Sequence, residues 1–147
     1  SLHTNDSPSA VTRLCNLGIE PYLVAATLRG VLAQRLVRKI CPHCKAACTP
    51  EDHAAAALAQ DCGTVDQLYR GEGCSRCRGT GFAGRIGMFE LLVPDSDFLD
   101  AIANAESLQS LRTRLEHSSF RTLRDDGMAK VRAGLTTPEE VLGATRL

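Results

Sequence analysis

The chain has 147 residues, in which 17 Lys and Arg balance 17 Asp and Glu, so its formal net charge is zero. This balance argues against a protein that coats nucleic acid, because neutralising phosphates normally requires an excess of Lys and Arg. Hydrophobic residues make up 44% of the chain and charged residues 23%, which excludes a disordered or collagen-like polypeptide. Only 4% of the residues are aromatic, so we expect a core of small and medium aliphatic side chains.

The sequence contains no membrane-spanning or export signal. No apolar run approaches the ~18–20 residues that a membrane span needs, and the N-terminus lacks the basic and then apolar pattern of a signal peptide. We therefore expect a cytoplasmic chain without a direct membrane span. The chain begins at Ser1 and not at Met, and we expect it to be part of a longer protein.

Two short helices and a strand are predicted first. Ser7-Pro8 is typical of a helix start, with Ser as the N-cap, and Gly18 is typical of a helix end. Pro21 begins a second helix, followed by alternating residues at 34–40 that predict a strand. Four apolar residues lie on one face of the second helix: Val24, Leu28, Val31 and Leu32.

Residues 41–83 differ in composition and are rich in Cys, Gly and small polar residues. Within them, Thr49-Pro50-Glu51-Asp52 resembles a capping box and predicts an Ala-rich helix at 50–62. A second strand is predicted at 85–93, where Pro94 ends it. We expect this strand to pair antiparallel with the strand at 34–40.

The remaining residues, 96–147, predict four short helices. The last begins at Thr137-Pro138-Glu139-Glu140, a capping box with Pro at the first helical position. The other three are marked by Phe98, Leu99 and Ile102, by Leu108, Leu111 and Leu115, and by Leu123 to Arg132.

Four of the seven cysteines form two Cys-x-x-Cys pairs, Cys41/Cys44 and Cys74/Cys77. Each such turn directs two sulfurs at one metal, and four thiolates suit tetrahedral Zn²⁺. If the two strands pair, each Cys pair lies beside a strand end and the hairpin brings all four sulfurs together. The pattern therefore predicts a structural zinc site with no position open for catalytic water.

These motifs also fit other interpretations. Cys48 or His43 is an alternative fourth ligand, and Cys41–Cys44 alone also resembles a thioredoxin-type redox motif, which requires a following helix. Cys74–Gly81 resembles one zinc repeat of a DnaJ-type chaperone, of which only one copy is present. Gly79–Gly84 matches G-x-G-x-x-G but precedes a strand, which favours a Gly-rich turn over a dinucleotide site. Cys15 is predicted to be a core residue, and Cys48 and Cys62 have no assigned function.

A series of motifs extends along the chain from the N-terminus to the last predicted helix. They are Ser1–Leu14 with His3, Thr4, Asn5 and Asp6, then Gly18–Tyr22, Gly30–Arg38, both Cys pairs, Gly84–Leu92, Leu123–Gly127, Lys130–Gly134 and Glu139–Leu142. This series resembles the ATPases of type II secretion and type IV pilus assembly, in which the first segment is called the His box. The sequences of Gly30–Arg38 and Leu123–Gly127 resemble the type II secretion ATPases (general secretion pathway protein E) more closely than the pilus ATPases.

The resemblance implies an α/β fold: the C-terminal part of a RecA-like P-loop ATPase domain, with an inserted tetracysteine zinc subdomain and a small helical C-terminal lobe. It assigns 1–40 to the end of the ATPase domain, 41–83 to the zinc-binding insertion and 84–94 to a returning strand. Residues 95–147 form the helical lobe in this division. Because the chain contains no G-x-x-x-x-G-K-S/T motif, we expect it to be inactive alone.

The resemblance also implies functional residues and partners. His3 and Thr4 would approach the phosphates of ATP bound with Mg²⁺, and Arg35 and Arg38 would contact nucleotide or a neighbouring subunit. From the residues alone, these two Arg are also explained as solvated strand-face charges. The full-length protein would be a homohexamer that powers pseudopilus assembly and protein secretion, bound through platform proteins at the cytoplasmic face of the bacterial inner membrane. The alternatives are a type IV pilus extension ATPase and a free-standing zinc-binding interaction module.

Overall fold

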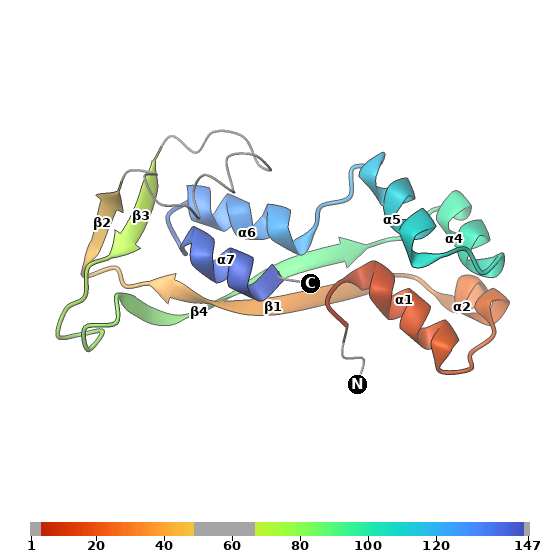
Figure 1. Ribbon diagram of the computed structural model, residues 1–147, viewed down its shortest axis with the longest axis horizontal. Coiled ribbons are helices and arrows are strands. Elements are labelled where there is room, and N and C mark those ends of the chain that lie inside the picture. The colour runs from red at the N-terminus through yellow and green to blue at the C-terminus, as the bar shows by residue number, and fades with distance from the viewer. Residues whose placement is uncertain (1–3, 49–66, 146–147) are drawn as a thin grey trace. The chain divides into compact units, whose positions relative to one another are not determined.

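A computed structural model describes residues 4–48 and 67–145 of the chain, which form a mixed α/β structure (Figure 1). None of the described helices is both long enough and apolar enough to span a bilayer. The elements, in chain order, are α1 (Ser7–Asn16), α2 (Pro21–Thr27), β1 (Val31–Ile40), β2 (Lys45–Cys48), β3 (Leu68–Gly71), β4 (Phe82–Leu92), α4 (Ser96–Ala103), α5 (Leu108–Glu116), α6 (Leu123–Arg132) and α7 (Pro138–Thr145).

The two predicted strands pair with each other. β1 and β4 are hydrogen-bonded neighbours and run in opposite directions (Figure 1). β1 begins earlier than expected, at Val31, because α2 ends at Thr27 and Leu28 is already extended, with φ −65° and ψ 127°. The prediction that α2 carries Leu28, Val31 and Leu32 on one face is therefore wrong: Gly30 interrupts the helical pattern, and β-branched Val31 favours a strand.

The chain divides into two compact units, each built from two separate stretches of sequence. The first unit contains the residues up to Ala33 and Phe89–Thr122. Asp6, and not Ser7, is the N-cap of α1, because the Asp6 carboxylate accepts the backbone N–H of Ser9 at 2.8 Å. The buried core of this unit consists of Val11, Val24, Leu92, Phe98, Ala101, Ile102 and Leu111, and Cys15 packs against it as expected.

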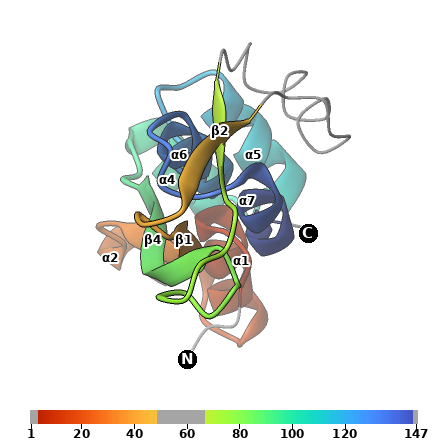
Figure 2. The ribbon, with the colours of Figure 1, turned by 90° about the vertical axis from the view of Figure 1, so that its left-hand side faces the viewer.

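The second unit contains Gln34–Met88 and the residues from Leu123 onward. It includes a second small sheet, in which β2 and β3 pair antiparallel from Lys45↔Gly71 to Cys48↔Leu68 (Figure 2). This sheet was not predicted, because Lys-Ala-Ala-Cys lacks the β-branched and aromatic residues typical of strands. The helix predicted at 50–62 lies outside the described residues.

All four helices predicted after residue 95 are present. They are divided between the units, since α4 and α5 belong to the first and α6 and α7 to the second. α6 contacts α7, and the most buried side chains of this pair are Met128, Val131 and Val141, each at most 1% exposed.

Gly127 of α6 allows this close packing. A Cβ at Gly127 would lie 2.6 Å from both Met88 Sδ and Val141 Cγ1, whereas a Cβ at Gly143 of α7 would meet nothing within 4 Å. We expect Gly127→Ala to destabilise the chain by about 1–3 kcal/mol through overpacking. The matched control Gly143→Ala should stabilise it by up to about 1 kcal/mol through helix propensity. Urea denaturation of both variants checks this, and equal midpoints would contradict it.

Candidate metal centre

Each Cys-x-x-Cys turn lies between two strands. Cys41 follows β1, and its backbone N–H donates to Gly81 O at 2.9 Å. Cys74–Cys77 lies between β3 and β4, in a turn closed by a hydrogen bond from Gly79 N to Cys74 O at 2.9 Å. The first turn leads into β2 and the second follows β3, so the pairing of β2 with β3 also holds the turns together.

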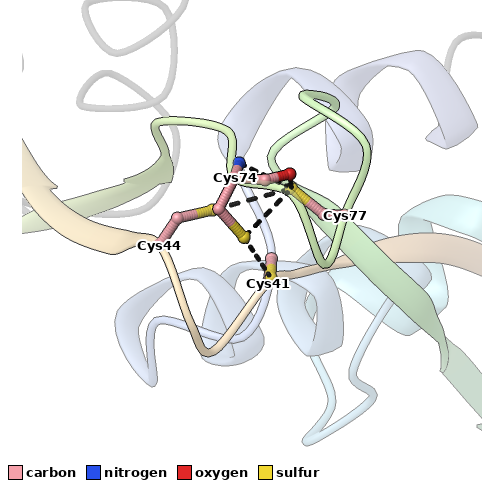
Figure 3. Close-up of side chains that lie close together, drawn as sticks. All are labelled: Cys41, Cys44, Cys74 and Cys77. Carbon is pink, nitrogen blue, oxygen red and sulfur yellow. Dashed lines mark hydrogen bonds between the residues drawn. The ribbon is translucent and has the colours of Figure 1, made fainter.

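The four sulfurs of Cys41, Cys44, Cys74 and Cys77 all lie within 4.8 Å of one another (Figure 3). The Sγ–Sγ distances are 4.0 Å for Cys41–Cys74, 3.8 Å for Cys44–Cys77 and 3.7 Å for Cys74–Cys77. A tetrahedron with Zn–S bonds of ~2.3 Å has edges of ~3.8 Å, whereas a disulfide needs ~2.05 Å. The cluster therefore has dimensions that fit one metal ion.

Backbone donors favour ionisation of Cys77. Desolvation alone would raise the pKa of its thiol, but the N–H groups of Cys74 and Gly81 lie 3.2 and 3.3 Å from its Sγ and together lower that pKa to about 6. Desolvation, together with hydrogen bonds among the thiols, raises the pKa of Cys44 to about 12. Metal ions bind thiolates, so the two N–H groups beside Cys77 Sγ favour the form of this side chain that a metal ion binds.

The glycines beside the cluster let two backbone segments touch. A Cβ at Gly71, the last residue of β3, would lie 1.9 Å from Gly81 O, and a Cβ at Gly81 would lie 2.4 Å from Gly71 O. Gly81 also has φ +74°, a conformation that side chains rarely adopt. These two glycines are part of the site although they contribute no ligand, and sequence reasoning missed the close approach.

The alternative ligands lie elsewhere. His43 Nε2 is 3.2 Å from Arg76 Nη1, and Cys48 is at the opposite end of β2 from Cys44. Cys62 lies outside the described residues. The redox interpretation is not supported, because the turn after Cys41 leads into β2 and not into a helix. Gly79–Gly81 lies in the turn before β4, and Gly84 lies within β4, so the segment opens a strand and not a helix.

Arg38, an expected nucleotide or subunit contact, has an intrachain partner. Its Nη2 and Nε lie 2.6 and 3.0 Å from Glu140 Oε1, and its backbone N–H donates to Glu140 Oε2 at 2.9 Å. The guanidinium also lies 4.2 Å from the centroid of the Phe82 ring. Glu140 was predicted to cap its own helix and instead binds β1, so the capping-box role is wrong for its carboxylate. Arg35 is half-buried on β1.

The His-box candidates precede α1. His3 lies outside the described residues, and Thr4 is half-buried. Two contacts hold the start of the helix: Arg112 Nη2 lies 2.6 Å from Asp6 Oδ2, and Ser7 donates to Glu90 through both its N–H and its Oγ. Glu90 is only 3% exposed and is therefore not a surface charge.

The Asp6–Arg112 pair makes stability depend on pH. Burial would raise the pKa of Asp6, but hydrogen bonds from Ser9 and the Arg112 guanidinium outweigh it and lower that pKa below 3.8. A lowered carboxyl pKa gives stability that is present above the unfolded value and lost as pH falls through the folded one. Asp6→Asn keeps a capping oxygen, so it should cost about 1 kcal/mol or less at pH 7 and flatten the loss of stability below about pH 4. Thermal melts from pH 7 to 3 measure this, and parallel profiles would refute it.

Comparisons with known proteins identify the family. The family described as "Type II/IV secretion system protein" matches residues 1–143. The chain is 42% identical over 147 residues to the Type IV pilus assembly ATPase PilB of Thermus thermophilus, covering 99% of this chain and 16% of that protein. It is 44% identical to the Type II secretion system protein E of Pseudomonas aeruginosa and 40% identical to the Type II secretion system ATPase E of Vibrio cholerae. Each of these alignments covers 99% of this chain and 29% of the relative.

The chain thus spans less than a third of the length of these curated relatives. The match extends over both compact units and includes the cysteine cluster. The chain belongs to the type II/IV secretion system protein family, whose relatives named above include ATPases of type II secretion and of type IV pilus assembly.

Proposed function

We propose that the chain acts as the C-terminal part of a secretion ATPase, whose full-length form hydrolyses ATP to power pseudopilus assembly and type II secretion. The observation that carries this proposal is 44% identity to a type II secretion protein over 99% of the chain. The chain covers 29% of that relative and contains no P-loop motif, so the nucleotide site of the whole protein needs residues outside it. The RecA-like framework and the division at residues 40, 83 and 94 belong to this proposal.

Within that protein, we infer that the cysteine cluster holds Zn²⁺. Four thiolates with edges near 3.8 Å suit zinc and leave no coordination position for water. Bound zinc supplies charge and cross-linking only. The chain's own residues supply the thiolates, the N–H donors to Cys77 Sγ and the glycine contact that closes the site. The centre therefore stiffens the connection between β1, β4 and the small sheet.

Nucleotide contacts, subunit contacts and location complete the proposal. His3 and Thr4 act near the phosphates of ATP bound with Mg²⁺, and Arg35 and Arg38 contact nucleotide or a neighbouring subunit of a homohexamer. Arg38 is paired with Glu140 within the chain, and its contact with nucleotide or a neighbouring subunit forms with this pair either closed or open. The protein works at the cytoplasmic face of the inner membrane, through platform proteins.

Type IV pilus assembly is the second candidate function. It is supported by 42% identity to PilB of Thermus thermophilus over 147 residues, a value close to that for the secretion relative. The same ATPase chemistry would then extend a pilus and not a pseudopilus.

A complementation experiment distinguishes type II secretion from type IV pilus assembly. The full-length protein containing this chain is expressed in its host after deletion of its gene, and secretion of exoproteins and pilus formation are both scored. The proposal expects restored secretion, ATP turnover by the purified protein, and loss of both in a P-loop Lys variant. Restored piliation without secretion would establish the second candidate. A purified full-length protein that hydrolyses no ATP would refute both.

A further inference from the structure

Glu90 is a buried carboxylate that the proposed function does not yet use. It lies on β4 in the first unit and is 3% exposed. Its Oε1 accepts the backbone N–H of Ser7 at 2.7 Å and the Ser7 hydroxyl at 2.5 Å. Ser7 is itself fully buried and is the first residue of α1. This contact joins two positions 83 residues apart in the sequence.

The geometry suits an anchor for the helix start. The first N–H groups of a helix have no intrahelical acceptor, and the positive end of the helix dipole favours a negative charge there. Glu90 supplies both an acceptor and a charge to the same end of α1. A buried carboxylate is costly unless it is hydrogen-bonded, so this arrangement holds Ser7 firmly at β4.

A second contact fixes the preceding residue. Arg112 of α5 lies 2.6 Å from Asp6, which in turn caps α1 through Ser9. Two consecutive residues are thus held by two different elements of the first unit. Thr4 lies two residues before Asp6, so the Cα atoms of these two residues are at most ~7 Å apart.

We propose that Glu90 is a positioning residue for the His box: by holding the start of α1 through Ser7, it fixes the position of Thr4, three residues earlier in the chain. This inference rests on the proposed ATPase function and on the role of the His box near the phosphates. A misplacement of ~1 Å near reacting groups costs about 100-fold in rate. The anchor therefore acts on the His box through Ser7.

The kinetic test uses the full-length protein containing this chain. We expect Glu90→Ala to lower kcat about 10- to 100-fold, with KM for ATP changed less than about threefold. Glu90→Gln should retain most of kcat, because its amide oxygen still accepts from both Ser7 donors. Glu20→Ala is the matched control: Glu20 is exposed and its side chain makes no capping hydrogen bond to α2, so kcat should not change.

A purely structural role is distinguished by a double-mutant cycle. In a background carrying His3→Ala and Thr4→Ala, Glu90→Ala should change the remaining rate less than about twofold. If its full effect persists there, or if Glu90→Ala leaves kcat unchanged in the wild type, the inference is overturned.

Hydrogen exchange tests the anchor separately from activity. In the chain itself, Glu90→Ala should accelerate amide exchange at Ser7 and Ala10, at the N-terminal end of α1, and leave exchange in α6 unchanged. Unaltered exchange at the start of α1 would overturn the inference, and so would exchange that rises throughout the chain, which indicates general unfolding. A wild-type enzyme without ATP turnover would instead refute the proposed function, while the exchange result still decides the anchor.

Discussion

Cys41→Ser is expected to weaken zinc binding by the chain at least ~100-fold. Cys41 is completely buried, and its sulfur lies 4.0 Å from that of Cys74. Structural zinc sites contribute about 10–16 kcal/mol, so an even share for one thiolate is about 3 kcal/mol, or at least ~100-fold in affinity. Because metal binding is coupled to folding, the melting temperature of the second unit should fall as well.

The measurement is zinc per chain by mass spectrometry, followed by a competition titration with a chelator. Cys15→Ala is the matched control, because Cys15 packs against the core of the first unit and lies outside the cluster. It should retain one zinc per chain. A Cys41→Ser variant that keeps wild-type zinc affinity would show that the four sulfurs do not form the binding site.

Gly71→Ala is expected to have nearly as large an effect, although it removes no ligand. The new Cβ would lie 1.9 Å from Gly81 O, an atom that already accepts the Cys41 N–H at 2.9 Å. A backbone atom cannot move aside as the end of a side chain can, so the two segments must separate. We expect a loss of about 3 kcal/mol or more in stability and at least a tenfold weaker affinity for zinc.

Gly81→Ala should behave similarly, because it combines a 2.4 Å contact with an unfavourable φ of +74°. Gly143→Ala, with open space around its Cβ, is the control. Thermal melts and zinc competition on the three variants check this. Wild-type values for Gly71→Ala would show that the close approach of the two backbones does not hold the site together.

Local sequence patterns predicted much of this fold. The alternation at 34–40 and the strand pattern ended by Pro94 at 85–93 predicted the β1–β4 pair. Cys-x-x-Cys spacing predicted the cluster, because these patterns depend on residues close together in the chain. The same kind of pattern located the four C-terminal helices.

Features that depend on distant residues could not be predicted this way. Glu140 has capping-box spacing, but Arg38, 102 positions away, competes successfully for its carboxylate. Glu is a residue type that is normally exposed, and only the packing of α1 reveals that Glu90 is buried. The Gly71–Gly81 approach likewise needs the paths of two separate segments.

The family match has a similar basis. It rests on ordered motifs along 99% of the chain, and it establishes the family while leaving secretion and pilus assembly at nearly equal identity.

Zinc K-edge X-ray absorption of the purified chain tests the metal centre most directly. A tetrahedral site built from Cys41, Cys44, Cys74 and Cys77 predicts one zinc per chain, with four sulfur neighbours at ~2.3 Å and no oxygen or nitrogen in the first coordination sphere. A chain purified without zinc, or one whose zinc has fewer than four sulfur neighbours, would contradict the account.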